Sequence, residues 1–502
     1  MSRRLSLVLS ILAAGFAPAT LAASAYGAGE SAPAAGNPAP VAADPTPLIE
    51  PATPGGLTSD QVAARVIATS PGLRADREES NARAFALAQA RASFVPRLST
   101  GLRYARQSRE SSPALGNLVA ASPDVPAGAT PDPAQLVALP LSFPTLVNHY
   151  EAQVSLDVPL SDYALRLPQL YEAAQKDARA AELLLAAHRL QAASEARVAY
   201  YDWVKARLQH RVAERTLERT RLHLSDAQTA LALGTASQAD VLSVEAQLAN
   251  AELALARALS ATEIQGRRLG VLMHDAAPVA YEIGEDLTGP DSATPAPSPD
   301  RERLLLERAL ERRLELRVLS ENAAGQRQRA RAALAAELPR LSASGSASYA
   351  RPNSRVIPPT DEFHGSWEVG VALSWSPTDL LGSDAGRQAT LARARQLDAQ
   401  GDELVDSIAL EVKSALSSRS ESEVRVKTSE RALTASAESH RVRRELFKNG
   451  RATSTELSDA ETEWSQAQLD VVAARVDRRI AQVKLAHALG EDVEAPAGSE
   501  TP

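Results

Sequence analysis

The same order of elements is predicted twice along this chain, and this repetition constrains the fold more than any other feature. The letters PRLS occur at Pro96 and again at Pro339, each time directly after an Ala- and Arg-rich helical stretch. Both halves then read as strand, loop, strand, long helix, glycine turn and helix, in units of roughly 220 residues. Two alanine-rich helices could resemble each other by chance, but the PRLS letters and the matched turns would not follow. We therefore predict an internal duplication.

The clearest strand lies at residues 366–376, where apolar and polar residues alternate without a break. Trp367, Val369, Val371, Leu373 and Trp375 share one face, because successive side chains of a strand point to opposite sides. The two tryptophans are about 26 Å apart at ~3.3 Å per residue. At a tilt of about 40°, this spans the ~25 Å apolar band of an outer-membrane barrel, whose rims carry aromatic residues. Taken alone, the segment also fits a half-buried strand of a soluble sheet.

Three further segments alternate in the same way, and they begin near Pro96, Tyr150 and Pro339. Their apolar faces carry Tyr104, Tyr150 and Tyr349. The opposite, polar face is predicted to hold serines and the charged residues Arg97, Arg103, Glu151, Asp157, Arg340 and Glu368. Residues 107–148, between the first two strands, are rich in Pro, Ser, Ala and Gly and show no periodicity, so we expect a long loop there.

Long helices with defined ends connect these strands to the turns. The first is expected over 163–233, and some 65 residues make a rod of roughly 100 Å. The second is expected over 386–448. Gly234 and Asn449-Gly450 end them, since glycine suits the left-handed position after a helix. Three capping boxes start the other helices: Thr58 with Gln61, Ser237 with Asp240, and Thr453 with Glu456.

The N-terminus has the pattern of a secretory signal. Arg3 and Arg4 supply positive charge, and residues 5–16 supply a short apolar run followed by Pro18. The chain contains no cysteine, which fits an exported protein and argues against a lipid-anchored terminus. We divide the chain into a signal peptide (1–25), a disordered Ala/Pro-rich leader (26–56), a first repeat (57–275), a linker (276–299), a second repeat (300–490) and a disordered tail (491–502).

Catalytic and cofactor motifs are not found in the sequence. No phosphate-binding loop, dinucleotide fingerprint, nucleophile elbow or HExxH is present. None of the eight histidines has the i, i+4 spacing of a helical metal pair, and we expect His188, His210 and His223 on helix surfaces. A net charge of −8 without a basic patch argues against a nucleic-acid partner. We expect no enzymatic activity and no cofactor or metal site. The predicted fold is mainly α-helical with a small β part.

The chain resembles the TolC-type outer-membrane factors over about 57–490. The resemblance rests on PRLS after each first helix, on the alternating strand after each loop, and on two turns. The turns read LALGTASQADVLSVEAQLANAEL from Leu231 and FKNGRATSTELSDAETEWSQAQL from Phe447. The resemblance implies the exit duct of a tripartite efflux pump or type I secretion system. The long first loop, 107–148, departs from a symmetrical duplication.

The resemblance also implies an assembly and its partners. Three copies would each give four strands to a twelve-stranded barrel in the outer membrane and their helices to a periplasmic α-barrel. The aromatic girdle facing lipid would include Trp367, Trp375, Tyr104, Tyr150 and Tyr349. The partners would be a periplasmic adaptor protein and an inner-membrane pump of the RND or ABC type, which supplies the energy.

Site residues follow from the family pattern at the two turns. An acidic pair past the second turn narrows the entrance in the family, and by position this pair is Glu456 and Asp459. Asp240 is the corresponding acid of the first repeat. Glu456 is also explained by its capping box alone. The tips that contact the adaptor would be Leu233, Gly234, Thr235, Asn449, Gly450 and Arg451.

A second function remains open at this point. An exported coiled-coil spacer or adaptor with a small soluble β domain would share the long helices. It would be a soluble monomer in a periplasmic extract, whereas the duct would form heat-modifiable trimers in the outer-membrane fraction.

Overall fold

A computed structural model of the chain describes residues 52–109, 116–121, 130, 132–140, 146–275, 281–287 and 298–491. The predicted signal peptide (1–25), the leader as far as residue 51 and the tail from residue 492 lie outside the described residues.

The described part is mainly helical with a four-stranded sheet and a two-stranded one, which confirms the fold class at that level. The elements of the first half are α1 (Ser59–Thr69), α2 (Pro71–Ala92), β1 (Arg97–Arg106), β2 (Asn117–Ala121), η1 (Pro133–Gln135), β3 (Leu136–Pro140), β4 (Asn148–Val158), α3 (Leu160–Leu165), α4 (Leu167–Ala232) and α5 (Gln238–Met273). Those of the second half are α6 (Pro299–Arg312), α7 (Leu314–Leu334), η2 (Ala335–Glu337), β5 (Arg340–Arg351), β6 (His364–Ser374), α8 (Asp379–Lys448) and α9 (Ser454–Ala488).

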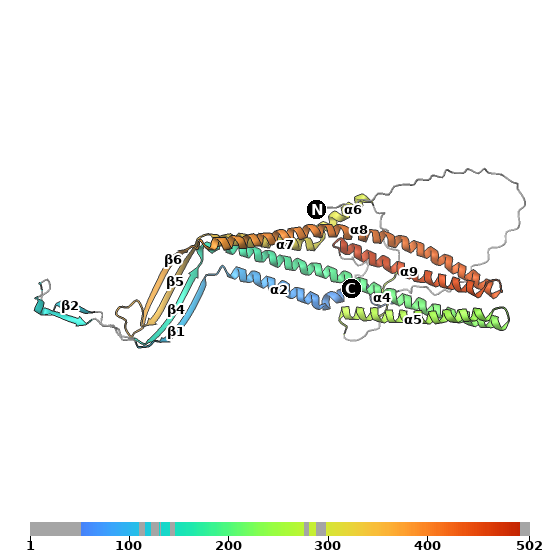
Figure 1. The fold of residues 1–502 in the computed structure, drawn as a ribbon, viewed down its shortest axis with the longest axis horizontal. Helices are drawn as coiled ribbons and strands as arrows, with labels where there is room; N and C mark the ends of the chain where they lie inside the picture. The colour runs from blue at the N-terminus through green and yellow to red at the C-terminus, as the bar shows by residue number, and fades with distance from the viewer. Residues whose placement is uncertain are drawn as a thin grey trace, which may run out of the picture. The chain divides into compact units, whose positions relative to one another are not determined.

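The two halves of the chain contribute their elements in a similar order (Figure 1). In each half a helix leads to the four-stranded sheet, two strands of that sheet follow, and a long helix leaves it and pairs with the next helix. The long helix α4 contacts α2 and α7, and it also contacts α5 and α9. Ion pairs mark these contacts near the sheet, between Lys176 and Glu321 at 3.0 Å, and far from it, between Lys205 and Asp477 at 2.9 Å. One long helix is thus covered by different neighbours at its two ends.

The helix boundaries follow the predicted signals, with two differences. A break at Arg166 separates α3 from α4, because Pro168 occupies the first turn of α4, where a missing N–H costs nothing. Helix α8 starts at Asp379 rather than at residue 386, since Gly382 and Gly386 are tolerated within it. All three predicted capping boxes are present. Within the described ranges, no helix combines the length and the apolar character needed to cross a membrane.

Between α5 and α7 the structure contains elements that the sequence reasoning did not predict. Helix α6 begins with a Ser298 cap, Pro299 and the acids Asp300 and Glu302, which are standard start signals. Part of the expected linker, 281–287, packs on the body of the protein, where Tyr281 and Leu287 are buried. The rest of that linker lies outside the described residues.

The prediction of a loop over 107–148 is wrong in part, because β2 and β3 form an antiparallel pair within this range. The sequences NLVAA and LVALP are apolar at consecutive positions. They therefore lack the period of two by which a one-sided strand is recognised.

The main core surrounds the middle of α4. Tyr200, Val204 and Leu208 are at most 1% exposed and pack with Leu269 of α5 and Val472 of α9. The Tyr200 hydroxyl donates to the Leu57 carbonyl at 2.7 Å, which ties the start of the described chain to α4. Burial raises the pKa of Tyr200 far above its usual range, with the Glu285 charge adding to the effect. This hydroxyl is therefore a permanent donor.

The burial of Leu208 in this core leads to a testable prediction for α4. Leu208→Ala should lower the free energy of unfolding by about 2–5 kcal/mol, because it leaves a cavity among fully buried neighbours. Leu222→Ala, on the same helix but 56% exposed, should change it by no more than about 0.5 kcal/mol. Thermal unfolding followed by circular dichroism measures both, and equal losses would contradict this placement of the core.

Candidate functional site

The four-stranded sheet has the order β1-β4-β5-β6 and is antiparallel throughout. Figure 1 shows these strands side by side at one end of the long helices. Among the described residues, neither β1 nor β6 pairs with a further strand. The sheet therefore has two open edges, each with a row of backbone N–H and C=O groups available for pairing.

One face of the sheet is apolar from edge to edge, as the sequence predicts. The register sets Leu98 opposite Leu156, Ala343 opposite Val371, and Ala347 opposite Trp367. On β6 the exposed fractions are 73% for Trp367, 73% for Val369 and 70% for Leu373. Side chains this apolar are seldom left uncovered over a continuous area in water. The face therefore requires an apolar environment beyond the described chain.

The other face is polar, again as predicted. Arg97 lies opposite Asp157 and Arg103 opposite Glu151, so the arginines of β1 face the acids of β4. Serine pairs continue the pattern, with the Ser99 and Ser155 hydroxyls 2.7 Å apart. A wet surface suits these groups, since a dry one would leave them unsatisfied.

Aromatic side chains gather at both ends of the sheet. Tyr104 and Tyr150 lie with ring centroids 5.0 Å apart, and Tyr349 stacks on Phe363 at 5.2 Å. Trp375 lies at the other end, where its indole N–H donates to the Glu337 carbonyl at 3.3 Å. Phe363 also lies 6.2 Å from Tyr150 and so links it to Tyr349. The sequence reasoning missed Phe363 because it lies outside the alternating segments.

The two predicted tips are exposed turns of the same design. Gly234 and Gly450 have φ of +73° and +68°, in the left-handed region that favours glycine. The following amides, of Thr235 and Arg451, bond back to Ala230 and Leu446 at 2.9 and 2.8 Å. Such bonds satisfy carbonyls at the end of a helix. Leu233 is 74% exposed, an apolar side chain without cover at the end of α4.

The acidic residues past the turns are partly used as caps. Glu456 accepts bonds from the Thr453 N–H at 2.8 Å and from its hydroxyl at 3.1 Å, and these bonds lower the pKa of Glu456. Asp240 is held in the same way by the Ser237 hydroxyl and N–H, which lower its pKa. Asp459 is exposed one turn further along. Both capping acids thus stay ionised at neutral pH.

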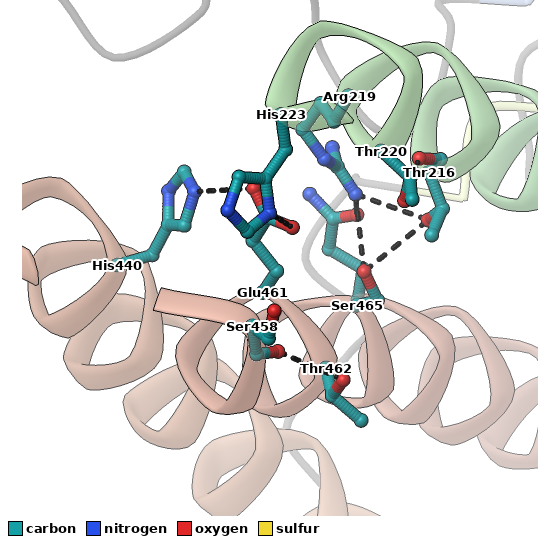
Figure 2. Close-up of polar contacts among 10 residues, drawn as sticks. Thr216, Arg219, Thr220, His223, His440, Ser458, Glu461, Thr462 and Ser465 are labelled. Atoms are coloured by element: carbon teal, nitrogen blue, oxygen red, sulfur yellow. Dashed lines mark hydrogen bonds and ion pairs between the residues drawn. The ribbon is translucent and has the colours of Figure 1, made fainter. Parts of the chain in front are cut away.

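A buried polar cluster (Figure 2) lies about ten residues inside both turns, which lie at the same end of the bundle (Figure 1). His223 of α4 contacts Glu461 of α9 at 3.1 Å, and His440 of α8 lies 3.7 Å from the same carboxylate. The prediction that His223 sits on a helix surface is wrong, since this residue is 3% exposed. His188 and His210 are partly exposed. Nothing near His223 in the sequence points to its partner.

Comparison with known proteins relates these features to a family. The sequence matches the family described as outer membrane efflux protein over residues 62–273 and 305–491. The structure is similar to the outer membrane protein VceC of Vibrio cholerae, at 17% identity over 87% of this chain and 97% of that chain, with a TM-score of 0.68. It is similar to the MtrE outer membrane channel of Neisseria gonorrhoeae in its open state, at 17% identity over 87% and 91%, with a TM-score of 0.69.

A third similar structure is the CmeC outer membrane channel of Campylobacter jejuni, at 14% identity over 89% of this chain and 91% of that chain, with a TM-score of 0.68. Identities this low relate the folds alone. None of the curated proteins matches the sequence.

Proposed function

This chain belongs to the outer membrane efflux protein family, and we propose that it is the passive exit duct of a tripartite efflux pump or type I secretion system. The observation that carries the proposal is the four-stranded sheet with two open edges, one apolar face and one polar face. We further propose that residues 57–275 and 300–490 are its two structural repeats, joined by 276–299.

Lipid accounts for both the apolar face and the open edges. An apolar face with aromatic residues at its two ends fits a bilayer with its two interfaces. In lipid, however, each unsatisfied backbone group costs several kcal/mol, so a sheet in a membrane must close. Four strands are too few to close, and identical neighbours would complete the barrel.

The number of copies follows from the interior that a channel needs. Two copies would give eight strands, and an eight-stranded barrel is filled by its own side chains. Three copies would give twelve strands and leave room for a polar lumen. The polar face, with Arg97, Glu151, Asp157 and Glu368, would line that lumen.

The helices support association of identical copies. Helix α5 exposes Leu242, Leu253, Leu259, Ile264 and Val271, and α8 exposes Val405, Leu410, Val424, Val442 and Leu446. A long helix with an uncovered apolar stripe needs a neighbour. We propose that these stripes of adjacent subunits meet in a periplasmic α-barrel.

The assignment of the two faces can be tested on one strand. Ala347→Lys places a charge on the apolar face near the middle of β5, where lysine facing lipid costs about 2–4 kcal/mol. Ser344→Lys places the same charge on the polar face of that strand, opposite Asp157. We expect the first change to reduce heat-modifiable trimer in the outer-membrane fraction and the second to leave it near the wild-type amount. Equal reductions would contradict the assignment.

The same fractionation tests the function class. Trimers in the outer-membrane fraction are expected of the duct. A soluble monomer in an aqueous periplasmic extract would instead favour the spacer or adaptor protein.

The exposed tips are proposed to contact a periplasmic adaptor, which links the duct to an inner-membrane pump of the RND or ABC type. Leu233, Gly234 and Thr235 form one tip, and Asn449, Gly450 and Arg451 form the other. The exposed Leu233 offers an apolar contact at the first tip.

A photo-crosslinking residue at position 233 should therefore capture an adaptor in cells. The matched control is position 304, a leucine that is 64% exposed on α6. We expect an adaptor conjugate at 233 and at most one tenth as much at 304, read by immunoblot and mass spectrometry. Equal capture at both positions would contradict an adaptor contact at the tip.

We propose that Glu456 and Asp459, with Asp240 of the first repeat, form a cation-sensitive constriction at the periplasmic entrance. Three copies of the pair would place six carboxylates near one axis, as rings of acidic side chains do in cation channels. The capping bonds of Glu456 do not exclude this role, because they leave its charge in place.

Glu456→Gln with Asp459→Asn should raise single-channel conductance in planar bilayers. Glutamine retains the capping box, so the change removes charge and leaves the helix start intact. Asp226→Asn, an exposed acid of α4, is the control and should leave conductance unchanged. Unchanged conductance in the double variant would remove the constriction assignment.

A further inference from the structure

The two ends of the apolar sheet face differ in charge. At the end joined to the long helices, the last positions of this face are occupied by Leu98, Val158, Leu341 and Trp375. At the far end (Figure 1), the last positions of β1 and β5 on the same face are occupied by Arg106 and Arg351. Two cations thus lie at one end of the face, and the described strands place none on it at the other.

Four aromatic rings lie next to these arginines on the apolar face. The ring centroid of Tyr150 lies 5.0 Å from that of Tyr104 and 6.2 Å from that of Phe363, and Phe363 stacks on Tyr349 at 5.2 Å. Aromatic residues of membrane proteins concentrate where the hydrocarbon meets the headgroups. In the proposed duct, the arginines two residues beyond Tyr104 and Tyr349 would therefore lie at the level of the headgroups.

Arg351 is held in a fixed orientation that leaves one of its nitrogens free to donate. Its Nε and Nη2 donate to the two carboxylate oxygens of Asp361 at 2.9 and 2.8 Å, and its guanidinium carbon lies 5.8 Å from the centroid of the Phe363 ring. Nη1 makes no hydrogen bond within the described part of the chain. The pair is exposed, at 37% for the arginine side chain and 57% for the aspartate. Arg351 can thus donate to a further anion without losing Asp361.

Arg106 supplies a charge that the described chain does not neutralise. It is exposed, and it has no ion-pair partner among the described residues. The nearby acid Glu362 lies 3.9 Å from His364, whose position in β6 belongs to the polar face. Since Asp361 balances Arg351, the described groups at this end of the apolar face carry a net positive charge.

On the basis of the proposed duct, we propose that this end of the apolar face binds the phosphorylated headgroup of a lipid in the outer leaflet, with Arg106 and Arg351 as the phosphate contacts. Guanidinium groups bind phosphate through two parallel N–H bonds and are more weakly hydrated than ammonium groups.

The position of the two arginines favours a lipid over a free phosphate ion. β1 and β5 lie two strand spacings apart, roughly 9–10 Å, so both arginines can approach one headgroup that lies across β4. Both also continue a face that is apolar from Trp375 to the aromatic rings. The acyl chains of the same lipid would contact these rings, whose apolar bodies suit this boundary.

Native mass spectrometry of the full-length protein in a neutral detergent measures lipid binding directly. Dioleoylphosphatidic acid carries a phosphate monoester, and dioleoylglycerol has the same chains without the phosphate. The first should bind at least about tenfold more tightly, because only its phosphate can form charge-assisted bonds with the arginines. Millimolar inorganic phosphate should not displace it. Equal binding of the two lipids would overturn the proposal, and displacement by inorganic phosphate would overturn the assignment to a lipid.

The proposed function is tested separately, by heat-modifiable trimer in the outer-membrane fraction. Wild-type trimer that binds no phosphatidic acid would reject the lipid site and leave the duct in place. Absence of trimer from that fraction would reject the duct itself.

Three variants locate the site. Arg106→Gln breaks no ion pair of the described chain, so it should assemble like the wild type and weaken binding of phosphatidic acid about threefold. Arg106→Gln with Arg351→Gln should weaken it at least about tenfold. Arg340→Gln is the matched control, because Arg340 is exposed at the other end of the sheet and on its polar face. Unchanged binding in Arg106→Gln, or an equal loss in Arg340→Gln, would overturn the proposal.

Discussion

The pairing of backbone groups at the two edges of the sheet is the constraint on which the rest of the structure depends. Strands β1 and β6 each offer an unpaired row of donors and acceptors, and the face beside them is too apolar for water. Lipid would cover the face but would not satisfy the edges. In the proposed assembly, another copy of the same sheet supplies a matching edge and continues the apolar face. The helices that leave β4 and β6 would then be arranged around the same axis as the strands.

The sheet was predictable because each strand's own sequence separates an apolar face from a polar face. Each strand alternates with a period of two, and a slip of one residue would turn every side chain to the wrong face. The observed register therefore agrees with the faces read from the sequence, from Leu98 opposite Leu156 to Leu341 opposite Leu373. The helix starts were predictable for a similar reason. A capping box is complete within four residues, and Thr58, Ser237 and Thr453 all cap as the sequence indicates.

The features that the sequence did not predict depend on residues far apart along the chain. The β2–β3 pair is apolar at consecutive positions, so periodicity gave no signal, and its register is fixed only by the pairing itself. Leu287 is buried in a core cluster whose other members come from α1, α4, α5 and α9. His223 is buried because Glu461, which lies 238 residues further on, is opposite it. In an alanine-rich helix the sequence does not indicate which side faces water. Only the tertiary structure decides whether a polar residue there contacts water or another helix.

The two ends of the α-helical part are stabilised by different means. Around Tyr200 and Trp203 an apolar core joins α1, α4, α5 and α9. Toward the tips the core shrinks to small clusters such as Ala227 with Val241 and Val244. There α9 carries a stripe of buried or half-buried polar residues, made of Ser454, Ser458, Glu461, Ser465 and Gln468.

At this level Ser465 contacts Thr216 at 3.3 Å and Gln468 accepts a bond from Arg219 at 3.2 Å, so polar contacts join α9 to α4 beside the apolar ones. Regions with few buried apolar contacts open at lower free energy than the core does. Glu461 lies at this level of the bundle, between His223 of α4 and His440 of α8. The larger apolar core around Tyr200 lies further from the tips and is expected to open at higher free energy.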